Sequence, residues 1–166
     1  MGKASGCILR ALAALAALSL AGCGASRGPS QGTAVSDGSS GAWSCVPYAR
    51  ARSGVSLRGD AWTWWEAAAG RYNRGRAPRN GSVLVLTRTA RLPRGHLAVV
   101  SRLVSAREVR VDHANWASGA AKGRVSRDQP VMDVSPANDW SLVRVWLPRI
   151  NGWGASNYPS YGFIHP

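Results

Sequence analysis

The sequence predicts an α+β domain, with short helices at its start and a small antiparallel sheet after them. Two segments between residues 44 and 70 are bounded by helix-capping residues and by glycines, a pattern that indicates helices. From residue 82 onwards, apolar runs of strand length alternate with turns rich in Gly, Asn and Ser. Helices followed by a series of strands are typical of the α+β class.

The first predicted helix begins at Cys45 and ends before Gly54. Ser44 is a favourable N-cap, and Pro47 fits the first turn, where its missing N–H leaves no bond unmade. Gly54 can adopt the left-handed conformation that commonly ends a helix. This arrangement places the Cys45 thiol at the positive end of the helix dipole, beside free backbone N–H groups that are expected to lower its pKa.

The second predicted helix covers residues 61–69, with Asp60 as its N-cap and Gly70 as its stop. Three residues at helical spacing are expected in the core: Trp62, Trp65 and Ala69. Trp64 falls on another face of the helix, where it is available to line a groove.

Five strands are predicted after the helices. Their ranges are 82–87, 96–103, 108–114, 130–135 and 141–147. The second and third of them form a hairpin that carries two histidines, an aspartate and an asparagine.

Side chains on a strand alternate between two faces, so the register of this hairpin decides which polar residues meet. A loop of two or four residues places Asn115 opposite His96, with His113 as the diagonal neighbour. A slip of two residues places His113 opposite His96 instead. In either register Asp112 faces the other way, toward solvent or an arginine.

Residues 1–22 form a predicted export signal, in which a basic start precedes an apolar run that is too short to span a bilayer. Residues 20–23 (LAGC) resemble a bacterial lipobox, which implies that Cys23 is lipidated; ordinary signal-peptidase cleavage is the alternative. Gly24 stands where aspartate would signal inner-membrane retention, so the resemblance points to the outer membrane. Residues 23–42 are a predicted flexible tether, and residues 43–166 are long enough for one domain with a single core.

Cysteine usage singles out Cys45. Cys7 leaves with the signal and Cys23 carries the lipid, so Cys45 remains as an unpaired thiol in an oxidising compartment. A catalytic nucleophile explains it, and so does a small buried hydrophobe or a disulfide with Cys23 in an unlipidated protein. A zinc site built from Cys45, His96 and His113 lacks a second cysteine and a close histidine pair, so no metal is expected.

The chain is strongly basic, with a formal net charge of +13 from 21 Lys and Arg against 8 Asp and Glu. In the cytoplasm this charge would indicate a nucleic-acid partner, but an exported protein meets anionic wall polymers and lipid headgroups instead. We therefore expect no nucleic-acid partner. A compositional bias of the genome toward arginine explains the excess equally well.

Three blocks of the sequence resemble the motifs of the CHAP family of cysteine- and histidine-dependent amidohydrolases and peptidases. They are residues 45–50 (CVPYAR), 95–100 (GHLAVV) and 112–116 (DHANW). The resemblance covers residues 44–166 and implies a papain-like fold, related to the NlpC-type cell-wall peptidases, with N-terminal helices packed on a small antiparallel sheet. It also implies cleavage of an amide bond in peptidoglycan, by an amidase or an endopeptidase.

Position by position, the resemblance implies that Cys45 is the nucleophile and His96 the general base. His113 stands where many relatives have glutamate, and Asn115 matches the amide of that motif, so either residue is a candidate to orient His96. Ser44 stands where many relatives have glutamine, which leaves open how the oxyanion hole is completed. The implied reaction passes through a thioester and requires no cofactor.

The sequence therefore predicts a monomeric peptidoglycan hydrolase, held by a lipid anchor on the periplasmic side of the bacterial outer membrane. Trp43, Trp64 and Trp116 are candidate walls of the substrate cleft, although each is equally expected in the core. The alternative function is a non-catalytic cationic envelope lipoprotein that binds cell wall or lipopolysaccharide.

Overall fold

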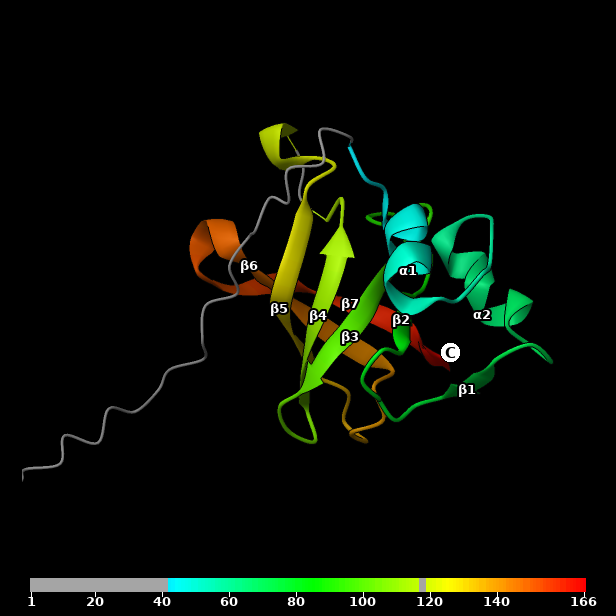
Figure 1. The fold of residues 1–166 in the computed structure, drawn as a ribbon. Helices are drawn as coiled ribbons and strands as arrows, with labels where there is room; N and C mark the ends of the chain where they lie inside the picture. Colours follow the sequence, from blue (N-terminus) through cyan, green and yellow to red (C-terminus); the bar gives the residue numbers. More distant parts are fainter. Residues whose placement is uncertain (1–41, 117–118) are drawn as a thin grey trace, which may run out of the picture.

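The structure is a computed structural model that describes residues 42–116 and 119–166 (Figure 1). The predicted export signal (1–22), the Cys23 anchor and nearly all of the predicted tether lie outside the described residues. Among the helices of the described ranges, none has the length and apolar character needed to cross a membrane.

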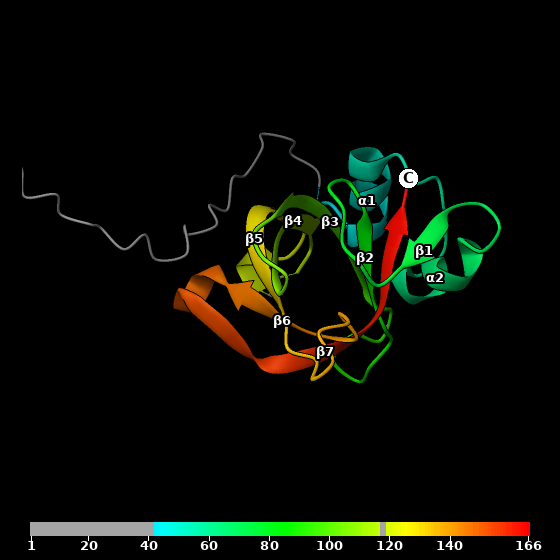
Figure 2. The same cartoon turned by 90° about the horizontal axis from the view of Figure 1, so that it is seen from below.

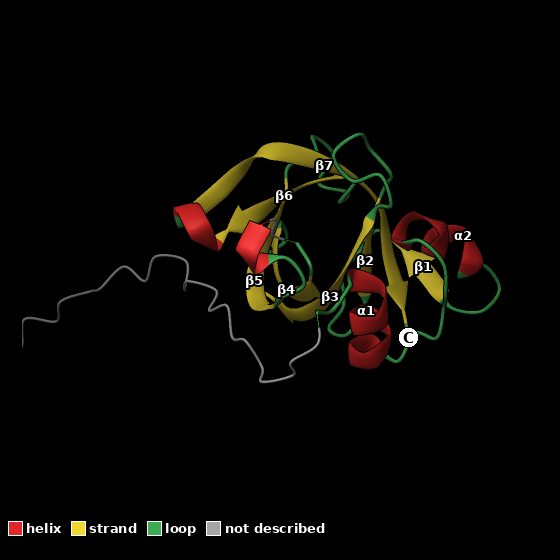
Figure 3. Cartoon of the chain, turned by 90° about the horizontal axis from the view of Figure 1, so that it is seen from above, coloured by secondary structure: helices red, strands yellow, loops and turns green. Residues whose placement is uncertain are grey.

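Six antiparallel strands form a closed barrel. They are β2 (Val83–Leu86), β3 (His96–Leu103), β4 (Glu108–Ala114), β5 (Val125–Asp133), β6 (Leu142–Leu147) and β7 (Gly152–His165). The long β7 closes the ring because its first half pairs with β6 and its second half with β2. A short strand, β1 (Asn73–Gly75), adds to β7 outside the ring. Figures 2 and 3 show the ring of strands from its two ends, with α1 outside it beside β2 and β3.

The predicted α+β, papain-like class with N-terminal helices on a small sheet is wrong for this structure, which is mostly β. The helices are short: α1 (Cys45–Ser53) has nine residues and α2 (Trp64–Ala67) has four. Three 3-10 segments make up the rest of the helical content of the described residues: η1 (Ala61–Thr63), η2 (Gly119–Ala121) and η3 (Pro148–Ile150). The class was misjudged because β7, with 14 residues, was not recognised as a strand.

Strand prediction succeeded where the apolar alternation is uninterrupted. The bounds of β3 and β4 are confirmed, and β2 and β6 lie within a residue of the predicted ends. β5 runs from Val125 to Asp133, whereas the prediction was residues 130–135. β7 contains Pro159 and Gly162, which normally weaken or interrupt a strand, but pairing along both of its edges holds it extended.

The first helix follows its prediction. Ser44 precedes it in an extended conformation (φ −98°), although its side chain makes no capping hydrogen bond. Gly54 ends it in the left-handed conformation (φ 77°) and donates its N–H to Arg50. Tyr48 and Ala49 are buried against the sheet, which fixes the N-terminal end of α1 over the start of β3 and the end of β4.

The second helix has a different buried face from the one predicted. Trp64 is fully buried, together with Ala61 and Ala68, whereas Trp62 and Trp65 are only half-buried and Ala69 is exposed. The segment starts with the 3-10 turn η1, in which side chains repeat every third residue, so the face rotates relative to a regular α-helix. Trp64 is therefore a core residue and does not line a groove.

Two apolar cores lie on opposite sides of the sheet. The inner core fills the barrel and includes Leu84, Ala98, Val100, Val109, Val111, Val145 and Phe163. The outer core joins the barrel to the helices and includes Ala49, Trp64, Val83, Val85, Leu97 and Val99. The alternation of side chains along β2 and β3 supplies both cores at once.

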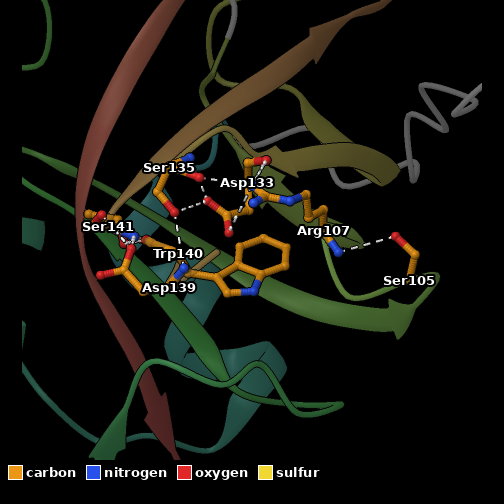
Figure 4. Close-up of polar contacts among 8 residues, drawn as sticks. Ser105, Arg107, Asp133, Ser135, Asp139, Trp140 and Ser141 are labelled. Carbon is orange, nitrogen blue, oxygen red and sulfur yellow. Dashed lines mark hydrogen bonds and ion pairs between the residues drawn. The ribbon is translucent and has the colours of Figure 1, made fainter. Parts of the chain in front are cut away.

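The β5–β6 connection, at one end of the barrel, contains a network of polar contacts (Figure 4). Asp133 accepts hydrogen bonds from the backbone N–H and the hydroxyl of Ser135 (2.8 and 2.6 Å), and Arg107 donates to the Ser135 carbonyl (2.8 Å). Trp140 adopts φ 61° and packs edge-on against Phe163, with ring centroids 5.4 Å apart. The start of β3 and the end of β4 lie at the opposite end, which carries the candidate site.

Candidate active site

Two histidines meet at this second end of the barrel. His96 is the first residue of β3, His113 lies near the end of β4, and both are buried. The His96 Nε2 atom lies 3.2 Å from His113 Nδ1, and the two rings are nearly perpendicular. The predicted convergence of the histidines on one face is therefore confirmed.

The register that produces this contact depends on two irregularities of the hairpin. Leu103 pairs with Val109, so the loop contains an odd number of residues and not the predicted two or four. A bulge between Val100 and Arg102 then shifts the pairing by one residue, so that Val99 pairs with Asp112. Continued to the start of β3, this register places Asn115 opposite His96 and His113 on the diagonal, as predicted.

Asp112 faces away from the histidines. Its Oδ2 atom lies 3.0 Å from Arg52 Nε, and its Oδ1 atom accepts the backbone N–H of Asp128 at 3.0 Å. The carboxylate is buried, with 5% of the residue exposed. The prediction that Asp112 turns away from the site toward an arginine is confirmed, and its interactions are structural.

Asn115 binds the β4–β5 connection and not His96. Its Oδ1 atom accepts the N–H of Gly123 at 2.9 Å, and the Gly123 carbonyl accepts the N–H of Trp43 at 3.0 Å. Gly123 has φ 79°, and a Cβ there would lie 2.7 Å from the Ala42 Cβ. Asn115 thus anchors the segment that leads into Cys45.

Cys45 is a half-buried free thiol at the start of α1. Burial raises its pKa, while the backbone N–H groups of Leu97, Cys45 and Val46 oppose the rise. The predicted lowering of the pKa is therefore wrong for the free protein, because desolvation outweighs the helix N-terminus. The sulfur reaches β3 at Leu97, the residue after His96, but no hydrogen bond joins it to the His96 ring in the described part of the chain.

An aromatic cluster covers the histidines. The Trp116 ring stacks on His113 with centroids 5.5 Å apart, and it meets the His96 ring at 4.7 Å. Tyr158 from β7 packs edge-on against Trp116 at 5.1 Å. Trp43, in contrast, packs against Tyr48 of α1. Of the three predicted wall residues, Trp116 is at the site, Trp43 flanks the start of α1, and Trp64 is in the core.

Both histidines are held neutral by their surroundings. Desolvation lowers the pKa of His96 well below 6.5, and the nearby His113 lowers it further. Desolvation lowers the pKa of His113 to about 4, against a smaller opposing effect of the Asp112 charge. At neutral pH each ring therefore carries one proton, which allows one nitrogen of each to accept a hydrogen bond.

Sequence reasoning missed a residue that positions His96. Gly95 has φ 67°, and a Cβ there would lie 2.7 Å from the Leu86 carbonyl oxygen and 2.8 Å from the Trp62 nitrogen. Only glycine fits between β2 and η1 without displacing one of them. The sequence offered a clue to this role, since Gly95 directly precedes His96 in the second motif block.

A pocket of about 530 Å³ opens beside the histidines at the same end of the barrel. His113, Trp116 and Tyr158 form one side of it, and Gln129 of β5 lies deep in the barrel. Three exposed arginines, Arg91, Arg124 and Arg149, stand at its rim. Of these residues, sequence reasoning identified His113 and Trp116, but not Tyr158, Gln129 or the arginines.

A family model for the CHAP domain matches residues 36–115, a range that contains Cys45, His96, His113 and Asn115. A search of curated proteins found no match. In the described ranges, no group of three or more His, Cys, Asp or Glu side chains is arranged to hold a metal ion.

Proposed function

We propose that this chain, whose residues 36–115 match the CHAP domain model, hydrolyses an amide bond in peptidoglycan with Cys45 as nucleophile. CHAP domains are in general hydrolases that act on peptidoglycan. The observation that carries the proposal is the 3.2 Å contact between His96 Nε2 and His113 Nδ1. His96 directly precedes Leu97, whose backbone N–H lies beside the Cys45 sulfur. Cys45, His96 and His113 lie at one end of the barrel, which supports their assignment as nucleophile, base and orienting group.

In this proposal His113 orients the base. When Nε2 of His96 carries the ring proton, it donates to His113 Nδ1, and Nδ1 of His96 is left as the basic nitrogen. The imidazolium formed later carries protons on both nitrogens, so the same contact stabilises it. Asn115 does not take this role, because its oxygen binds Gly123.

The thiol reacts by general-base catalysis in this account, because burial keeps Cys45 protonated in the free enzyme. His96 Nδ1 removes the thiol proton as Sγ attacks the amide carbonyl, and a tetrahedral intermediate forms. Backbone N–H groups at the start of α1 face the developing oxyanion. His96 then protonates the leaving amine, and water attacks the resulting thioester to release the acid and regenerate the thiol.

We also propose that the enzyme works from the outer membrane through a lipid on Cys23. The predicted tether of residues 24–42 has a root-mean-square reach of about 25 Å as a random coil, which suits a domain that searches nearby wall. Metabolic labelling with a palmitate analogue tests the anchor. Cys23→Ala should abolish the label and release the protein from membranes, and an unlabelled wild type would contradict the anchor.

A non-catalytic wall-binding lipoprotein is the second candidate, favoured by the raised pKa of Cys45 and by the three arginines at the pocket rim. Incubation of the purified domain with sacculi separates the two functions. Hydrolysis releases soluble fragments, whose masses also distinguish an amidase, which frees whole stem peptides, from an endopeptidase, which cuts within the peptides. Binding without release of fragments would favour the second candidate.

A further inference from the structure

The pocket beside the histidines contains a buried polar side chain and several charged side chains, which the packing of the barrel does not need. Its floor holds Gln129, which is fully buried on β5, opposite Val111 of β4. The Gln129 amide nitrogen donates to the Arg127 carbonyl at 2.8 Å, but its Oε1 atom has no hydrogen-bond partner. A buried acceptor without a hydrogen-bond partner costs free energy, so this oxygen is expected to accept a hydrogen bond from a bound molecule or from water.

The rim of the same pocket is positively charged and unneutralised. Arg91, Arg124 and Arg149 line it, and no Asp or Glu does. None of the three forms a salt bridge within the described residues, in contrast to Arg52 and Arg107, which pair with buried aspartates. Arg91 donates a hydrogen bond to the Ser156 hydroxyl at 3.1 Å, and Ser156 also lines the pocket.

The pocket adjoins the proposed catalytic groups through His113. His113 and Trp116 line it, and the Nδ1 atom of the same His113 ring lies 3.2 Å from His96 Nε2. Apolar residues such as Leu92, Val145 and Leu147 line the remainder. A ligand there would meet an apolar cavity, one deep hydrogen-bond acceptor and a ring of guanidinium groups.

From these features we propose that the pocket binds the stem peptide of peptidoglycan through its free carboxylates. The arginines bind the carboxylates, and a peptide N–H donates to Gln129 Oε1. The inference rests on the proposed function and deepens it, because it makes the charge of the stem peptide a determinant of specificity. Substrates whose stem-peptide carboxylates are amidated should bind less well.

Calorimetric titration of the Cys45→Ser protein with a soluble muropeptide tests this proposal without turnover. We expect the peptide with free carboxylates to bind at least about tenfold more tightly than its carboxyl-amidated counterpart. The double variant Arg124→Gln/Arg149→Gln should remove this preference, and Gln129→Leu should weaken both peptides. Arg58→Gln is the matched control, because Arg58 is exposed and lies outside the pocket.

Equal affinity for the two peptides would overturn the proposal, and so would an Arg58→Gln effect as large as that of the rim variants, because the attraction would then be non-specific. Unchanged affinity in Gln129→Leu would show that water satisfies its oxygen, and would overturn the role of Gln129. Release of fragments from sacculi by the wild-type protein is measured separately. Hydrolysis without selective binding refutes only this inference, and selective binding without hydrolysis refutes only the proposed catalysis.

Discussion

The Nε2 atom of His96 lies 3.2 Å from Nδ1 of His113, and this contact determines which nitrogen of His96 is available for chemistry. The other nitrogen, Nδ1, has no hydrogen-bond partner within the described residues. His96 can therefore be held by His113 on one side and act as a base on the other.

Replacement of His113 by alanine should lower turnover of a peptidoglycan fragment by about a hundredfold or more. The substitution removes the acceptor that holds His96 in its reactive tautomer and that stabilises its charged form. Turnover is measured after circular dichroism shows that the variant is folded. Because His113 is buried, a loss of stability is also expected, so the comparison is made well below the melting temperature.

Asp112→Ala and Asn115→Ala are matched to His113→Ala, because Asp112 lies on the same strand, β4, and Asn115 directly follows it. Asp112→Ala should change turnover by less than about tenfold but destabilise the fold by about 1–3 kcal/mol, because it breaks the contacts to Arg52 and the Asp128 N–H. Asn115→Ala should have an intermediate effect on turnover, since it loosens the segment before Cys45. If Asp112→Ala proved the most damaging to turnover, the assignment of His113 would fall.

The stability of the domain should decrease as the pH falls below 6.5. The folded-state pKa of His113 is about 4, below its ordinary value of 6.5, so the unfolded chain binds the proton first. The contribution of His113 is constant above pH 6.5 and becomes unfavourable as the pH falls toward 4, by on the order of 3 kcal/mol. Urea denaturation at pH 7 and pH 4.5 measures the change. His113→Asn should flatten the dependence, and an equal slope in both proteins would contradict the lowered pKa.

Alkylation of Cys45 in the free protein should be slower at pH 7 than alkylation of a small free thiol. Burial raises the pKa of Cys45, so the thiolate fraction at neutral pH is smaller than usual. The rate with iodoacetamide should climb to its plateau only above the ordinary thiol pKa. Rapid alkylation at pH 7 would show instead that a thiolate–imidazolium pair exists before substrate binds.

Gly95→Ala should disrupt the site more than a glycine substitution that creates only backbone strain. A Cβ at residue 95 would approach the Leu86 oxygen and the Trp62 nitrogen to less than 3 Å. Gly81 also has a positive φ (83°) but nothing within 4 Å of its Cβ position, so Gly81→Ala is the control. We expect about 1–2 kcal/mol of destabilisation for Gly81→Ala and a clearly larger value for Gly95→Ala, with loss of turnover. Urea denaturation and turnover measure both, and equal effects would contradict the positioning role of Gly95.

The parts of the fold that sequence reasoning recovered are those with a local signal. α1 has a capping residue and a terminating glycine, and β3 and β4 alternate without interruption. The site register also agreed with the prediction, but only because the odd loop and the bulge at the β3–β4 hairpin compensate for each other. Neither irregularity has a recognisable signature in the sequence.

The closure of the barrel could not be predicted because it depends on non-local pairing. The sequence of β7 contains glycines, Pro159 and several polar residues, and it is extended only because β2 and β6 bind its two edges. Tyr158 and Gln129 lie in segments that were not recognised as strands, so their places in the pocket were hidden as well. The raised pKa of Cys45 likewise results from burial, which cannot be predicted from the helix-capping residues around it.

The most direct test of the account is the release of soluble fragments from purified sacculi by the wild-type protein and by two cysteine variants. Cys45→Ser should fold normally and release less than a few per cent of the wild-type amount, because serine at this position lacks the nucleophilic sulfur. Cys23→Ser, which changes the other cysteine of the predicted mature chain, should release as much as the wild type once both are purified. Retention of substantial activity in Cys45→Ser, or no release by the wild type, would contradict the cysteine mechanism.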